Sequence, residues 1–161
     1  MLTRRQFLQS TAAAATTASL APAAAPAATP SDIGALMRAT DGLGLAELVK
    51  SGEITPLDLA REAVQTALAL DGRLNAITTP MYERALDHAA TMRPQGPFAG
   101  VPFLVKDNID VAGQYTTSGS RVFQDHLARH SAPLVLIQQA AGLNIIGKTN
   151  MPEVGALPTT E

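Results

Sequence analysis

Lys106 is the residue of this 161-residue chain whose setting points most directly to chemistry. It follows an apolar run, residues 101–105, whose composition predicts a buried β-strand. An ammonium group at the end of such a strand loses hydration unless it is paired or sheds its proton. Because side chains alternate along a strand, we expect Lys106 and Asn108 on one face and Asp107 on the other. Asp107 is then not forced to pair with its neighbour, and Lys106 can stay neutral enough to act as a base.

Three separated segments give Lys106 a more specific context. They are GPFAGVPFLVKDNID at residues 96–110, TTSGS at 116–120 and GKTNMPE at 147–153. In order and spacing they resemble the amidase signature family, with a match that extends over about residues 42–161. Several separated motifs of this length are far more specific than one short motif. Without these segments we would interpret Lys106 as a structural lysine paired with a carboxylate. With them a functional role is the favoured interpretation.

The resemblance implies an α/β fold with a mixed central sheet flanked by helices. It also implies hydrolysis of amide carbon–nitrogen bonds by a serine, cis-serine, lysine triad, in which Lys106 matches the family lysine. In that scheme the neutral lysine takes a proton through the cis-serine as general base, the serine attacks the carbonyl, and backbone amides hold the oxyanion. We expect a small-molecule amide as substrate, and no cofactor.

The nucleophile is the part of the family pattern that this sequence lacks. Both family serines belong to a Gly/Ser-rich loop beyond the segment at 147–153, and the sequence reaches Glu161 before such a loop. Ser118 and Ser120 match the TTSGS stretch instead, outside any nucleophile elbow, and we expect them to form loop hydrogen bonds. We therefore predict the N-terminal part of an amidase domain over residues 31–161, inactive as it stands. The alternative is a noncatalytic or partner-dependent binding remnant of that fold.

Two patterns suggest other kinds of site. Residues 142–149 fit the phosphate-loop pattern G-x-x-x-x-G-K-[ST], but the framed Leu-Asn-Ile-Ile is typical of a strand, and Pro152 falls where the helix would need its second turn. We therefore expect no bound nucleotide. His126 and His130 share a face only if their stretch is helical, and the chain has no cysteine, so we expect no metal site. The formal net charge of -2 gives no reason to expect nucleic acid binding.

Residues 1–30 are interpreted as an export signal and linker. Arg4 and Arg5 precede an apolar pair and then a weakly apolar, alanine-rich stretch with A-x-A spacing, which resembles a twin-arginine signal. Pro22 and Pro26 break that stretch, which is too short to span a bilayer. The signal predicts a periplasmic or exported protein that meets the membrane only during export. It also disfavours the cytoplasmic branch of the family that supplies ammonia for transamidation on charged RNA.

The elements that position Lys106 follow from hydrophobic periodicity. We expect helices at residues 43–50, 55–72, 81–92 and 133–141, and strands at 74–79, 101–105 and 143–147. Strand, helix and strand over 101–147 predict a βαβ crossover with parallel pairing. A sheet limited to these strands would have an unpaired edge and an uncovered apolar face. Residues 31–161 alone are therefore expected to be marginally soluble or to associate.

Overall fold

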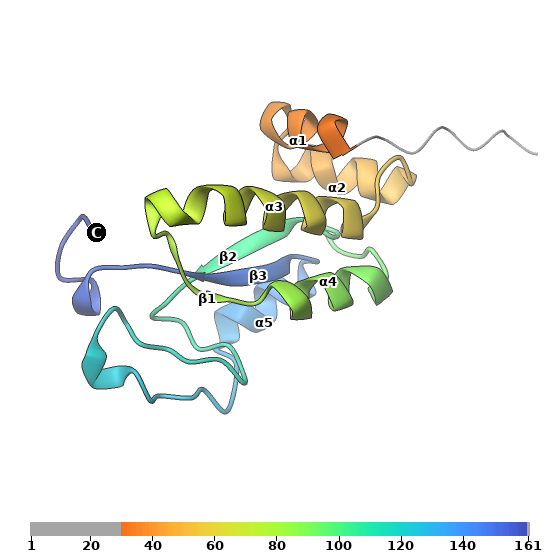
Figure 1. Cartoon of the computed structure of the whole chain (residues 1–161). Helices are drawn as coiled ribbons and strands as arrows, with labels where there is room; N and C mark the ends of the chain where they lie inside the picture. The colour runs from red at the N-terminus through yellow and green to blue at the C-terminus, as the bar shows by residue number, and fades with distance from the viewer. Residues whose placement is uncertain (1–29, 161) are drawn as a thin grey trace, which may run out of the picture.

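The structure is a computed structural model and describes residues 30–160 (Figure 1). The predicted twin-arginine signal, except for Pro30, lies outside the described residues. In chain order the elements are α1 (Pro30–Ala39), α2 (Gly42–Ser51), α3 (Pro56–Leu74), β1 (Ile77–Pro80), α4 (Tyr82–Thr91), β2 (Pro102–Lys106), η2 (Arg121–Phe123), α5 (Pro133–Ala140), β3 (Asn144–Thr149) and η3 (Glu153–Gly155). Within residues 30–160, no helix is both long and apolar enough to cross a membrane.

The three strands form one mixed sheet in the order β1-β3-β2. β2 runs parallel to β3, and α5 connects them, which confirms the predicted βαβ crossover. β1 pairs antiparallel with the other side of β3. The expected α/β fold with a mixed central sheet is confirmed. In this sheet β2 pairs only with β3, so its outer edge is open within the described part of the chain.

Helix α3 is fixed at both ends by its own side chains. At the start, Thr55 accepts a hydrogen bond from the Asp58 amide, and the Asp58 carboxylate accepts one from the Thr55 amide. The predicted end at residues 71–72 is wrong, because the helix continues through Gly72 to Leu74. It ends at Asn75, which takes a left-handed conformation with φ of 47°. The Asp71 carboxylate then accepts hydrogen bonds from the next two amides, at 2.7 and 2.9 Å, and so turns the chain into β1.

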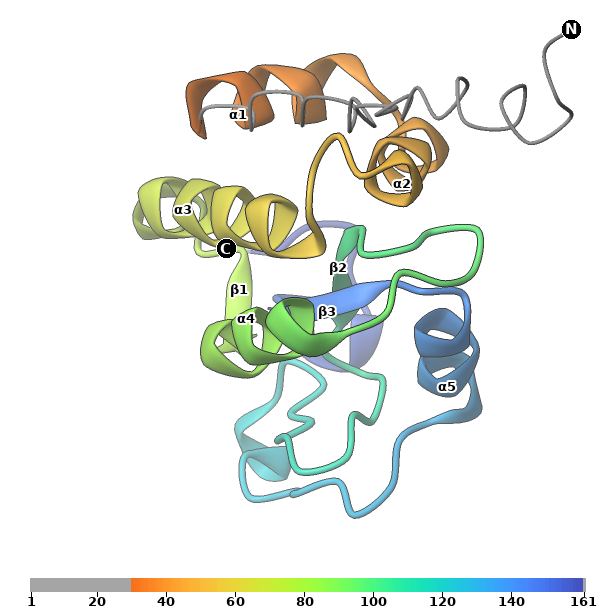
Figure 2. The ribbon, with the colours of Figure 1, turned by 90° about the vertical axis from the view of Figure 1, so that its right-hand side faces the viewer.

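Helices cover both faces of the sheet, as Figure 2 shows. α3 lies over one face, with α1 and α2 stacked beyond it, and α4 and α5 lie on the other side. One apolar cluster joins the first helices to the start of β2, through residues that include Leu45, Leu59 and Val101. A second cluster lies beneath the sheet and is made of Met81, Val105, Val111, Val135 and Ile145. The second cluster packs the inner face of β2, the strand that ends at Lys106.

Candidate active site

Lys106 is the last residue of β2, and its side chain is exposed. The predicted alternation is confirmed, since Lys106 and Asn108 are exposed and Asp107 between them is fully buried. The expectation that the Lys106 ammonium is desolvated is wrong for residues 30–160, because β2 is an edge strand and Lys106 lies at its very end. Among these residues, the Lys106 side chain forms no salt bridge. The amine is thus available to groups from outside the described segment.

Asp107 pairs with a second lysine, Lys148 of β3. Lys148 Nζ lies 3.0 Å from Asp107 Oδ1, and both side chains have no exposed surface. The same ammonium donates hydrogen bonds of 2.7 Å to the Tyr115 carbonyl oxygen and to Thr116 Oγ1. Burying two charges costs free energy that their attraction offsets only when the remaining donors and acceptors are also satisfied. The two hydrogen bonds from Lys148 to the loop meet part of that condition.

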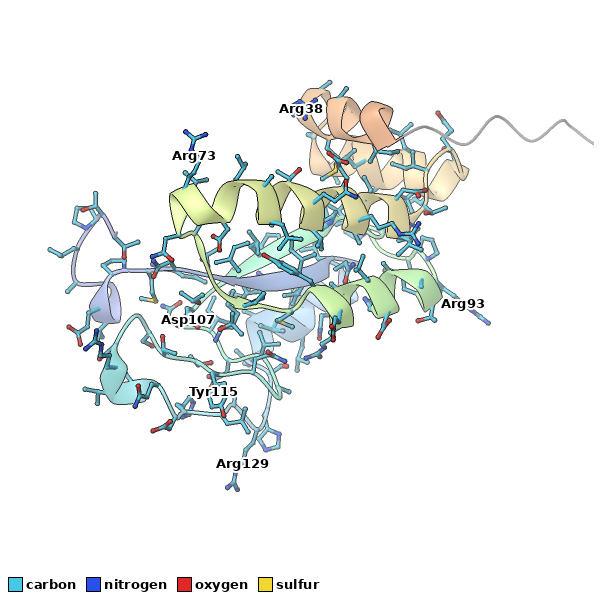
Figure 3. All side chains as sticks on the ribbon, viewed as in Figure 1. Arg38, Arg73, Arg93, Asp107, Tyr115 and Arg129 are labelled. Atoms are coloured by element: carbon cyan, nitrogen blue, oxygen red, sulfur yellow. The ribbon has the colours of Figure 1, made fainter. Side chains whose placement is uncertain are left out.

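The TTSGS segment at residues 116–120 forms hydrogen bonds with both the side chain and the backbone of Asp107. Asp107 Oδ2 accepts hydrogen bonds from the Thr117 amide at 3.1 Å and from Thr117 Oγ1 at 2.5 Å. The Asp107 carbonyl oxygen accepts one from the Ser118 amide at 3.2 Å. Figure 3 labels Asp107 below the sheet and Tyr115 in the loop beneath it. The loop is therefore attached to the end of β2 through both the backbone and the side chain of Asp107.

The segment at 147–153 joins the same assembly. Ser120 Oγ donates a hydrogen bond of 2.6 Å to Glu153 Oε1 and accepts one from the Val122 amide. The Val154 amide donates to the Ser118 carbonyl oxygen at 2.8 Å. The expectation that Ser120 serves in loop hydrogen bonding is confirmed. The three segments that carry the family resemblance thus contact one another at the end of β2.

Gly119 shows how closely two of these segments approach. Its φ is 69°, in the left-handed region that favours glycine. A Cβ at this position would lie 2.4 Å from the carbonyl oxygen of Met151. The backbone of the TTSGS segment therefore packs directly against the backbone of the segment at 147–153, with no room for a side chain.

The residues of the phosphate-loop pattern form a strand, as the sequence predicted. Asn144–Thr149 is β3, which is buried between β1 and β2. After Pro152 the chain forms the short 3-10 turn η3 in place of the long helix that a phosphate-binding loop needs. The lysine of the pattern, Lys148, is buried against Asp107. Residues 144–149 therefore form the central strand of the sheet and not a phosphate-binding loop.

The histidines are dispersed in the described structure. His126 Nε2 lies 3.5 Å from Asp110 Oδ1, in a stretch that is not helical, so the four-residue spacing to His130 does not create a shared helix face. His88 Nδ1 lies 3.2 Å from Asn144 Oδ1. Within residues 30–160, no group of three or more His, Cys, Asp or Glu side chains is placed to hold a metal ion.

Comparison with known proteins agrees with this geometry. A family model described as Amidase matches residues 58–161. The chain belongs to the amidase family. The 6-aminohexanoate-cyclic-dimer hydrolase of Paenarthrobacter ureafaciens is 38% identical over 124 residues, 75% of this chain and 25% of the relative. A glutamyl-tRNA(Gln) amidotransferase subunit of Deinococcus radiodurans is 41% identical over 123 residues, 73% of this chain and 25% of the relative.

Solved structures of amidases share the fold of the chain. A substrate complex of 6-aminohexanoate cyclic dimer hydrolase matches 81% of this chain and 26% of its own, with a TM-score of 0.70 and 35% identity. Peptide amidase from Stenotrophomonas maltophilia matches 71% of this chain and 25% of its own, with a TM-score of 0.64 and 34% identity. The chain thus spans about a quarter of the length of the relatives it matches.

Lys148 and its partners are the site residues that the sequence reasoning missed. The signal was present, because the rule that a lysine in a buried strand needs a partner applies to Lys148 next to Ile145 and Ile146 as much as to Lys106. What the sequence does not give is the partner. Asp107 lies 41 positions away and is brought close only by the parallel pairing of β2 with β3, which sets Lys148 opposite Val105.

Proposed function

We propose that this chain is the N-terminal part of an exported amidase that hydrolyses an amide carbon–nitrogen bond with Lys106 as general base. The main support is the convergence of the three family segments at the end of β2, where the buried Asp107 is anchored and the adjacent Lys106 is left exposed. An exposed amine on a fixed strand end is accessible to reacting groups that another segment of the protein would supply.

The proposed reaction follows the scheme that the family resemblance implies. A neutral Lys106 accepts a proton from a second serine, which takes the proton of the nucleophilic serine as that serine bonds to the amide carbon. The carbon–nitrogen bond then breaks as the proton passes to the leaving amine. Water hydrolyses the resulting acyl ester and restores the serine. Both serines are expected from sequence beyond residue 161.

The substrate class is a small-molecule amide, and residue type alone does not choose among amides. The relatives named above include a 6-aminohexanoate cyclic dimer hydrolase and a peptide amidase, and a further structural match is an aryl acylamidase of the amidase signature family, with a TM-score of 0.67 and 27% identity. The same three kinds of compound form the assay panel: 6-aminohexanoate cyclic dimer, a peptide amide and an anilide. Release of amine or ammonia is the readout.

The decisive experiment compares two lysine variants of the natural-length gene product. Lys106→Ala should lower kcat by about 10²–10⁴-fold, because it removes the general base. Lys50→Ala is the matched control, since Lys50 is also exposed but lies on α2, outside the three segments, and forms an ion pair with Glu47 at 3.0 Å. Unchanged hydrolysis by the folded Lys106→Ala variant would remove Lys106 from the mechanism.

The coding DNA beyond the codon for Glu161 tests the origin of the serines. A reading frame that continues into a Gly/Ser-rich segment would agree with the amidase proposal. A genuine stop codon would favour the alternative, a noncatalytic or partner-dependent binding remnant.

The proposed export is tested separately by cell fractionation. Changing Arg4 and Arg5 together to lysine should retain the protein in the cytoplasm if the leader is a twin-arginine signal. Export that persists in this variant would contradict the assignment, and ammonia release from glutamine in a cytoplasmic protein would favour the transamidation branch instead.

A further inference from the structure

The backbone of Lys106 is held on both sides by neighbouring contacts. Lys106 pairs in register with Thr149 of β3, and the Asp107 amide donates a hydrogen bond of 3.2 Å to the Thr149 carbonyl oxygen. The Lys106 carbonyl oxygen accepts a hydrogen bond of 3.0 Å from the Ile109 amide. These bonds fix the end of β2 relative to β3. They do not fix the loop at residues 115–118, which needs a second attachment to the sheet.

The buried Asp107–Lys148 pair supplies that second attachment. It links β2, β3 and the loop at residues 115–118 through one ammonium and one carboxylate. Lys148 Nζ and Asp107 Oδ1 form an ion pair without a hydrogen bond, and the hydrogen bonds of both side chains run to the loop. The pair therefore ties the loop to the sheet more than it ties the two strands to each other.

Stability alone is a weak reason for this arrangement. Ile145 and Ile146 precede Lys148 in β3 and are buried, so the strand already has apolar neighbours. Replacing a buried ion pair by apolar residues of similar volume is often neutral or stabilising in other proteins. A fully buried lysine that donates two hydrogen bonds to the loop at residues 115–116 and forms an ion pair with Asp107 is better explained by a requirement for one defined geometry around Lys106.

We propose that Asp107 and Lys148 are positioning residues for Lys106. This inference rests on the proposed amide hydrolysis with Lys106 as base. The pair holds the backbone from 106 to 118 in one arrangement, so that the amine of Lys106 stays within reach of the serine from which it takes the proton. A displacement of about 1 Å can cost about 10²-fold in rate, because proton transfer requires hydrogen-bond distance. We expect substrate binding not to depend on the pair, because neither side chain has exposed surface with which to contact a substrate.

The test uses the natural-length gene product and measures kcat and KM, with kcat expressed per active site by titration with an acylating inhibitor. Lys148→Met should lower kcat about tenfold or more while KM stays nearly constant. Thr116→Val removes only the hydroxyl acceptor of the Lys148 ammonium and should lower kcat by a smaller factor. Thr116→Ser keeps that hydroxyl and should restore the wild-type kcat.

The outcomes separate positioning from folding. If Lys148→Met does not fold, the Thr116 variants decide, because they leave both charges in place. Wild-type kcat per active site in folded Lys148→Met or in Thr116→Val would overturn the inference, as would a rise in KM that accounts for the whole loss. If Lys106→Ala is fully active, the proposed function itself fails. If Lys106→Ala is inactive and the Lys148 and Thr116 variants are not impaired, only the positioning inference fails.

Discussion

Lys106 and Asp107 are consecutive in the chain, yet the Asp107 carboxylate is buried 3.0 Å from Lys148 while the Lys106 side chain is exposed. The alternation of a β-strand separates them, and the pairing of β2 with β3 provides Asp107 with its own cation. The Asp107 charge is thereby balanced inside the protein. Lys106 is left without an ion pair among residues 30–160, as a residue that acts on a proton requires.

The first prediction concerns the coupling of Asp107 with Lys148. Asp107→Asn and Lys148→Met should each lower the free energy of unfolding by about 3–5 kcal/mol, because each leaves one buried charge unpaired. The double variant should lose clearly less than the sum of the two, since it buries no net charge. Urea denaturation of the four proteins gives the coupling energy. Additive losses would mean that the two charges do not stabilise each other.

A second prediction concerns the start of α3. Thr55→Ala should lower the free energy of unfolding by about 1 kcal/mol, because it removes the acceptor of the Asp58 amide and disturbs the reciprocal bond of the capping box. Thr55→Ser keeps the hydroxyl and is the matched control. Thermal unfolding of the three proteins measures the effect, and equal stability of the alanine and serine variants would contradict it.

Local sequence signals predicted most of the fold. The Gly52 stop of α2, the Thr55 cap of α3 and the strand–helix–strand run from β2 to β3 depend on neighbours within a few residues, so they are visible in the sequence. Helix α1 was not predicted. It contains Gly34 and buries Ile33 against other helices, so its stability comes from tertiary packing more than from its own sequence.

The site was predictable in its motifs and not in its contacts. The alternation at residues 106–108 followed from strand geometry. Apolar residues predicted the strand at 143–147, which the structure extends over 144–149. The contacts of Asp107 with Thr117 and Lys148 depend on how a loop folds back beneath the sheet, which no local pattern encodes. Exposure of Lys106 likewise depends on which strand lies at the edge of the sheet.

The third prediction concerns Tyr82 at the start of α4. Burial, and secondarily the negative charge of Asp71, raises the pKa of the Tyr82 phenol above its usual value of 10.0. Because the folded state disfavours the phenolate, this contribution to stability is complete below about pH 10 and is lost as the pH rises through the folded pKa. Unfolding free energy should therefore decline with pH in that alkaline range.

Asp71→Asn tests the cause of that shift, since it removes the charge and keeps an oxygen that can accept from the Ala76 and Ile77 amides. The pKa of Tyr82 should move down toward its usual value without reaching it, because burial remains. Residues 31–161 contain two tyrosines, Tyr82 and Tyr115, so phenolate absorbance of this segment with Tyr115→Phe isolates the Tyr82 titration. A pKa that rises, or stays unchanged, in the Asn variant would show that Asp71 does not contribute.

The last prediction concerns the groove between α3 and the sheet. It encloses about 700 Å³, and its lining includes Leu70 and Leu74 of α3 and Phe103 and Leu104 of β2, next to the open strand edge. An apolar groove beside an unpaired edge favours contact with a second copy, so residues 31–161 alone should associate as concentration rises.

Leu74→Glu should weaken that association, because a charge would enter an apolar contact. Leu68→Glu is the matched control, since Leu68 is 65% exposed on the same helix and lies outside the groove lining. Sedimentation velocity over a range of concentrations distinguishes the three proteins. Equal effects of the Leu68 and groove substitutions would assign the result to net charge. A monomeric segment 31–161 with a reversible unfolding transition would show that the groove and the strand edge do not drive self-association.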